Sequence, residues 1–130
     1  MVRKIPGASE SNWYSQMAWS NLYKIAKAQK GNANPTDDER AAQQKGSEEL
    51  LRMKIAELKP KCVFMFVDYW WAKPFLIKLG VDISKANYKS SYVQLISKYR
   101  DSRIIVTARP DSRKRGVRLQ KFVGKVLENY

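Results

Sequence analysis

The sequence contains no histidine and only one cysteine, Cys62, among its 130 residues. Histidine is the side chain that most often moves protons near neutral pH, and together with cysteine it builds the usual zinc sites. We therefore expect no metal and no other cofactor. A single cysteine cannot form an intramolecular disulfide, so we expect Cys62 to be a packed thiol in a reducing compartment.

Glycine-rich loops and long apolar runs are also lacking. The six glycines are scattered singly, so the sequence has no phosphate-binding loop of the nucleotide-binding kinds. Residues 1–11 lack the apolar core of a signal peptide, and no apolar run approaches the ~20 residues that cross a bilayer. We expect a cytoplasmic protein that does not enter a membrane.

Acidic residues are scarce relative to basic ones. Lys and Arg number 25 against 12 Asp and Glu, which gives a net charge of +13. A balanced mixture of charges would solvate the surface equally well without this self-repulsion. Because bound Lys and Arg side chains release counterions from phosphates, the excess favours a nucleic-acid partner.

The clearest local signal is the start of a helix. Thr36 is a suitable N-cap and Glu39 follows three residues later, which together form a capping box. Apolar residues then recur at helical spacing until Pro60, so the pattern predicts a helix over residues 36–58.

Three apolar segments predict strands, and two of them are continuous runs, as in strands buried on both faces of a parallel sheet. The predicted strands are residues 18–25, 62–67 and 103–108. Two further helices are predicted over residues 70–79 and 117–129, and residues 81–99 have a helical or mixed pattern.

This order of elements predicts an α/β protein, with one domain over residues 1–130 of which 1–17 are poorly assigned. We expect a three-layer α/β/α sandwich with a short, mainly parallel sheet. Ligands of such sheets bind beyond the carboxyl ends of the strands. Polar, aromatic or basic residues lie at the end of each predicted strand. Asn21 lies late in the first strand, Asp68 and Trp70 follow the second, and a basic loop follows the third. The basic residues of that loop and the next helix are Arg109, Arg113, Lys114, Arg115 and Arg118.

Each of these candidates has an alternative reading. Asn21 either reads a planar base or binds neighbouring backbone, and Trp70 is either a base platform or a core anchor. Asp68 is either a carboxylate that activates water or the N-cap of the helix that follows it.

Five motifs in succession resemble the uracil-DNA glycosylase superfamily. They are WSNLYKI, GNANPTDDE, ELKPK, CVFMFV and WWAKPF, and the match extends over most of residues 18–125. The resemblance implies a DNA-binding protein that recognises a flipped uracil or other damaged base and hydrolyses its N-glycosidic bond in base excision repair. It implies that Asn21 hydrogen-bonds the flipped base and that the loop from Arg109 enters the DNA minor groove. In a glycosylase, Arg109 would support the leaving group and Trp70 would stack on the base. Asp68 and Asp111 are the candidate catalytic carboxylates at the predicted strand ends.

The sequence departs from the family at two places. Nothing in residues 1–16 matches the strand and Gly-Pro loop that precede this region in family members, so we expect an N-terminally incomplete domain. Its partner is then a second copy of the chain or a missing N-terminal segment. Arg109 stands where many members have histidine. The alternative function is a non-enzymatic basic DNA-binding module.

Overall fold

The computed structural model describes residues 17–24, 35–90 and 92–109, together with Lys121, Gly124 and Glu128. The chain divides into two compact units, which are treated separately below. One unit comprises residues 18–59, and the other comprises residues 60–130 with residues 1–17. A single domain over residues 1–130 stays a prediction.

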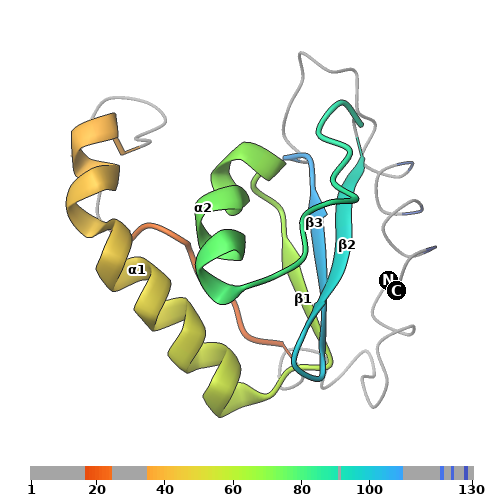
Figure 1. The fold of residues 1–130 in the computed structure, drawn as a ribbon, viewed down its shortest axis with the longest axis horizontal. Helices are drawn as coiled ribbons and strands as arrows, with labels where there is room; N and C mark the ends of the chain where they lie inside the picture. The colour runs from red at the N-terminus through yellow and green to blue at the C-terminus, as the bar shows by residue number, and fades with distance from the viewer. Residues whose placement is uncertain are drawn as a thin grey trace. The chain divides into compact units, whose positions relative to one another are not determined.

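The first unit is built on helix α1, Asp37–Leu58 (Figure 1). The predicted capping box is present: Thr36 Oγ1 accepts a hydrogen bond from the Glu39 backbone N–H, and Glu39 Oε2 accepts one from the Thr36 N–H. Asp37, Asp38 and Glu39 place negative charge at the positive end of the helix dipole. The prediction of a helix over residues 36–58 is therefore confirmed.

The prediction of a strand over residues 18–25 is wrong for residues 18–24, which have no strand pairing. Instead, two glutamine side chains of α1 accept hydrogen bonds from this segment. Tyr23 Oη donates to Gln44 Oε1 at 2.5 Å, and the Lys24 backbone N–H donates to Gln43 Oε1 at 2.9 Å. A strand needs neighbouring backbone on at least one side, whereas this segment is mostly exposed and finds its partners on a helix.

The second unit contains a three-stranded mixed sheet. Its strands are β1 (Cys62–Met65), β2 (Val93–Tyr99) and β3 (Ser102–Thr107), in the order β1-β3-β2. β1 is parallel to β3, with Val63 opposite Ile104. β2 is antiparallel to β3, which confirms mixed α/β structure but not a mainly parallel sheet.

The predicted strands over residues 62–67 and 103–108 are confirmed with shifted ends. The helical alternative for residues 81–99 is wrong for residues 93–99, which form β2. Their neighbour is the reason: β2 joins β3 through a tight hairpin, and Arg100 takes a positive φ of 53° at its turn. The hairpin ladder decides the structure of a segment whose own pattern is ambiguous.

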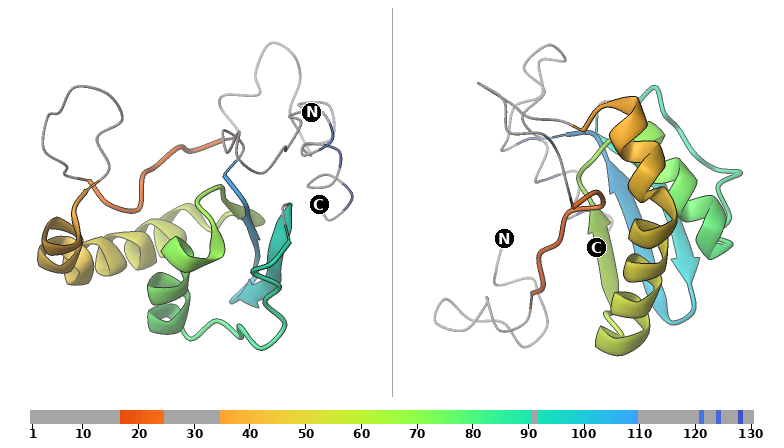
Figure 2. Two further views of the ribbon diagram at one scale, coloured as in Figure 1. Left: turned by 90° about the horizontal axis from the view of Figure 1, so that it is seen from above. Right: turned by 90° about the vertical axis from the view of Figure 1, so that its left-hand side faces the viewer.

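Helix α2, Tyr69–Leu79, packs on the sheet (Figure 2). It confirms the helix predicted over residues 70–79 and ends at Gly80, whose φ of 77° suits glycine. Phe75 and Leu76 of α2 are fully buried, as are Ile105 and Val106 of β3. This core fixes the start of α2 relative to the ends of β1 and β3.

Of the helix predicted over residues 117–129, only Lys121, Gly124 and Glu128 are described, and all three are helical and exposed. The remainder of that prediction lies outside the described residues. Within the described part of the chain, no helix is long and apolar enough to span a bilayer.

Candidate nucleic-acid interface

Two of the predicted site residues come together where β1 and β3 end. Because β1 and β3 are parallel, their carboxyl ends lie at the same edge of the sheet, which we call the carboxyl edge. Asp68 follows β1, Arg109 follows β3, and the Asp68 backbone N–H donates to the Thr107 carbonyl oxygen at 3.0 Å. The structure thus places Asp68 and Arg109 at one edge, as strand direction alone predicts.

Asp68 is the backbone N-cap of α2, but its side chain does not cap the helix. The Asp68 carbonyl accepts hydrogen bonds from the Trp71 and Ala72 N–H groups, while no cap hydrogen bond is made by its carboxylate. Its φ of 69° is unusual for a residue other than glycine. The carboxylate instead accepts from Gln94 Nε2 at 3.3 Å, which directs it toward β2.

Gln94, which sequence reasoning missed, organises the carboxyl edge. Its side chain is almost completely buried, and Oε1 accepts from the Tyr69 backbone N–H at 2.6 Å. Nε2 also donates to the Ser90 carbonyl oxygen at 3.0 Å. One side chain therefore ties β2 to the start of α2 and to the loop before β2. The sequence feature that could have identified Gln94 is its polar side chain between the apolar residues Val93 and Leu95.

Three aromatic rings form a cluster beside Asp68. Tyr69, Trp70 and Tyr88 have ring centroids 5.2 to 6.1 Å apart, and we call them the aromatic cluster. Tyr69 is buried, whereas Trp70 is 58% exposed and Tyr88 is 48% exposed. Trp70 is therefore not a core anchor, and its role as a platform for a base stays a prediction. Tyr88 was not foreseen from the sequence.

Positive charge lies next to the aromatic cluster. Lys73 Nζ is 5.2 Å from the centroid of the Trp70 ring, a cation–π contact made within α2. Lys89 directly follows Tyr88 and is exposed. Exposed rings that stack on bases, with adjacent ammonium groups that hold phosphates, are the usual components of a surface for unpaired nucleic acid.

The other predicted site residues are not brought to this edge by the structure. Asn21 belongs to the unit of residues 18–59, where it is exposed and is not at a strand end. Its predicted position in a strand is wrong, and its reading of a base stays a prediction. Arg113, Lys114, Arg115 and Arg118 lie outside the described residues.

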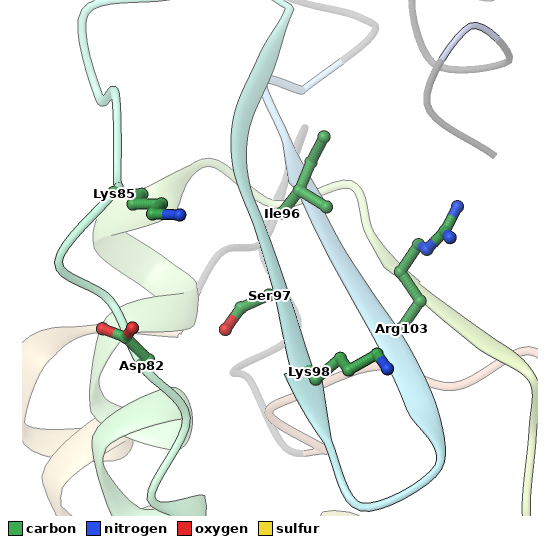
Figure 3. A pocket seen from close by; sticks show the side chains of 6 residues that line it. All are labelled: Asp82, Lys85, Ile96, Ser97, Lys98 and Arg103. Atoms are coloured by element: carbon green, nitrogen blue, oxygen red, sulfur yellow. The ribbon is translucent and has the colours of Figure 1, made fainter.

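A shallow cavity of about 290 Å³ lies near the turn of the β2–β3 hairpin, away from the carboxyl edge (Figure 3). It is lined by Asp82, Lys85, Ile96, Ser97, Lys98 and Arg103. The hydrogen bond from the Ser84 backbone N–H is the main cause that lowers the pKa of Asp82, so this carboxylate stays ionised at neutral pH. The lining contains cations but no ring, so a base would find no stacking partner here.

Neither a metal site nor a reactive thiol is found in the regions that the structure describes. No group of three or more Cys, Asp or Glu side chains there is arranged to hold a metal ion. Cys62 is half-buried in β1, and this burial raises the pKa of its thiol to about 11. The thiol is thus protonated at neutral pH and is a poor nucleophile.

The reactivity of Cys62 tests this environment. At pH 8, iodoacetamide should alkylate the folded protein about 100-fold more slowly than a free thiol with a pKa of 9.0, because the thiolate fraction is that much smaller. Mass spectrometry over time measures the rate, and protein unfolded in urea is the control. Equal rates for the folded and unfolded protein would contradict the assignment.

Comparisons of the chain with protein-family models, with curated proteins and with solved structures found no match. The geometry of the carboxyl edge and the charge of the chain therefore carry the functional argument.

Proposed function

We propose that this chain is a uracil-DNA glycosylase-like, DNA-binding protein of the cytoplasm that stacks an unpaired base on Trp70 and Tyr88. The observation that carries the proposal is the exposed pair of rings, with centroids 5.2 Å apart, on a chain of net charge +13. In this proposal the sheet and α2 are two layers of a three-layer α/β/α sandwich. A second copy of the chain pairs with the outer edge of β1.

Stacking determines the form of DNA that should bind. Bases within a duplex already stack on their neighbours, so their faces are not accessible to a side chain. The half-exposed rings of Trp70 and Tyr88 suit a base that is single-stranded or flipped out of the helix. Each stacked base contributes about 1–3 kcal/mol, with little dependence on its identity. We therefore expect tighter binding of single-stranded than of duplex DNA at equal salt concentration.

Phosphate contacts are expected from the basic loop that follows Arg109. Changing Arg113, Lys114 and Arg115 together to Ala should weaken binding and reduce the slope of log affinity against log salt by about 0.7 per lost contact to a single strand. A matched variant with Lys45, Lys61 and Lys78 changed to Ala loses the same charge at exposed positions elsewhere. Fluorescence anisotropy at several salt concentrations measures both slopes. Equal slopes in the two variants would show that this loop makes no phosphate contacts beyond those of any exposed lysine.

Hydrolysis of an N-glycosidic bond is the second candidate function, and the position of Asp68 favours it. This carboxylate lies two residues before Trp70 and is held on one oxygen by Gln94, so it is positioned to orient a water molecule near a stacked base. Arg109 would stabilise negative charge on the departing base, since a guanidinium cannot exchange protons near neutral pH. Asn21 would read the base, as the resemblance implies.

Asp68→Asn separates hydrolysis from binding. Asparagine retains the oxygen that accepts from Gln94 but removes the charge, so release of uracil from a single-stranded oligonucleotide should fall at least about 100-fold while affinity changes little. Chromatography of released uracil measures the rate. If the unmodified chain releases no base, hydrolysis is excluded and the DNA-binding proposal stands.

A further inference from the structure

Two lysines converge on one hydroxyl group in the unit of residues 18–59. Ser20 Oγ accepts hydrogen bonds from Lys24 Nζ at 2.8 Å and from Lys54 Nζ at 2.9 Å. Lys54 comes from α1, and the other two residues come from the segment before it. Both ammonium groups therefore lie close to each other around a neutral oxygen.

This arrangement is electrostatically unfavourable without an anion. Partial burial, and secondly the charge of Lys54, lower the pKa of Lys24. In the described ranges neither lysine forms an ion pair with a carboxylate, and the ion pairs of α1 join Arg40 to Asp37 and Arg52 to Glu49. A serine hydroxyl supplies only a dipole to two positive charges.

The structure nevertheless holds the pair in place. The segment that carries Ser20 and Lys24 is attached to α1 through the hydrogen bonds of Tyr23 and Lys24 to Gln44 and Gln43. Gln44 Nε2 in turn donates to Glu48 Oε1 at 2.7 Å, which fixes the amide. These hydrogen bonds position the backbone of Ser20 and Lys24 beside α1, which carries Lys54, so less of this segment has to be ordered when an anion binds.

We propose that Lys24, Lys54 and Ser20 form a phosphate-binding site. A phosphate oxygen accepts from both ammonium groups at once. The Ser20 hydroxyl, which donates to the Asn21 carbonyl oxygen at 3.3 Å, can turn to donate to a second phosphate oxygen instead. Bound phosphate removes the repulsion between the lysines. This chemistry is common to a phosphodiester of a DNA backbone and to a free phosphate. The site shares no residue with the aromatic cluster, so either proposal can fail without the other.

Titration of the full chain with inorganic phosphate tests the site. Saturable shifts of the backbone amide resonances of residues 20–24 are expected in two-dimensional NMR spectra. Lys24→Gln with Lys54→Gln should weaken phosphate binding at least about 10-fold, because two charge-assisted hydrogen bonds are lost. Lys24→Arg with Lys54→Arg retains both charges and should bind within about 3-fold of the unchanged chain. The control, Lys45→Gln with Lys78→Gln, should have no effect.

The same variants with a single-stranded oligonucleotide distinguish the two sources of phosphate. Weaker binding of both the oligonucleotide and inorganic phosphate by the Lys24/Lys54 glutamine variant supports a backbone phosphate. Loss of inorganic phosphate alone supports a free phosphate. The proposal is overturned if phosphate moves none of these resonances, or if the Lys45/Lys78 control loses as much affinity. Circular dichroism checks that each variant is folded. If the glutamine variant unfolds, the resonance shifts of the unchanged chain and of the folded arginine variant still decide whether phosphate binds at this site.

Discussion

Replacing both Trp70 and Tyr88 by alanine is expected to weaken binding of single-stranded DNA by about 10- to 100-fold. The estimate follows from the 1–3 kcal/mol that stacking on an aromatic side chain typically contributes per base. Both rings are about half exposed, so their loss should leave the core of the second unit intact. Fluorescence anisotropy with a labelled oligonucleotide at fixed salt concentration measures the change.

Ile77→Ala provides the matched control for this experiment. Ile77 lies on the same helix as Trp70 and is exposed to the same degree, 57% against 58%, but it has no ring. Its replacement should change DNA affinity less than 2-fold, because loss of exposed apolar area alone has little effect. An equal loss in both variants would show that α2 contributes apolar contact rather than base stacking.

Gln94→Leu is expected to lower the free energy of unfolding by about 2–4 kcal/mol. The side chain is 2% exposed, and leucine would leave the Tyr69 N–H and the Ser90 carbonyl without their partner. Each buried polar group left unpaired costs about 1–3 kcal/mol. Urea denaturation monitored by circular dichroism measures the loss.

The same substitution should also weaken DNA binding under conditions in which the variant remains folded. Gln94 holds the start of α2, which carries Trp70, and the loop that carries Tyr88. Ser97→Ala on the same strand is the control and should cost less than about 0.5 kcal/mol. Stability of Gln94→Leu equal to that of the control would show that the hydrogen bonds of Gln94 are replaced by other partners.

Elements whose signals are local could be predicted from the sequence. The capping box of Thr36 and Glu39 defines the start of α1 with neighbouring residues only, and Gly80 ends α2 in the same way. The apolar runs of β1 and β3 also correspond to strands. In these cases the signal that predicts the element lies within the element or directly beside it.

The wrong secondary-structure predictions concern segments whose hydrogen-bonding partners are not the ones that the sequence suggests. Residues 18–24 have the apolar and aromatic content of a strand, yet in the structure their partners are glutamine side chains of α1. Residues 93–99 have an ambiguous pattern, and the hairpin with β3 makes them a strand. A tertiary contact overrides intrinsic propensity in both cases.

The candidate site could be predicted in part. Strand direction alone places Asp68 and Arg109 at the carboxyl edge, which is why this juxtaposition could be foreseen. Tyr88 could not be predicted, because it lies in an irregular loop and meets the Trp70 ring through a tertiary contact. The predicted position of Asn21 at this edge depended on a strand over residues 18–25, and residues 18–24 do not form one.

The most direct test of the proposed function is the indole resonance of Trp70. The chain has four tryptophans, so their side-chain N–H signals are few enough to assign with single Trp→Phe variants in two-dimensional NMR spectra. Upon addition of a single-stranded oligonucleotide, the Trp70 indole signal should shift saturably, and more than that of the half-buried Trp71. A Trp70 signal that does not move while the oligonucleotide is bound would contradict base stacking at the carboxyl edge.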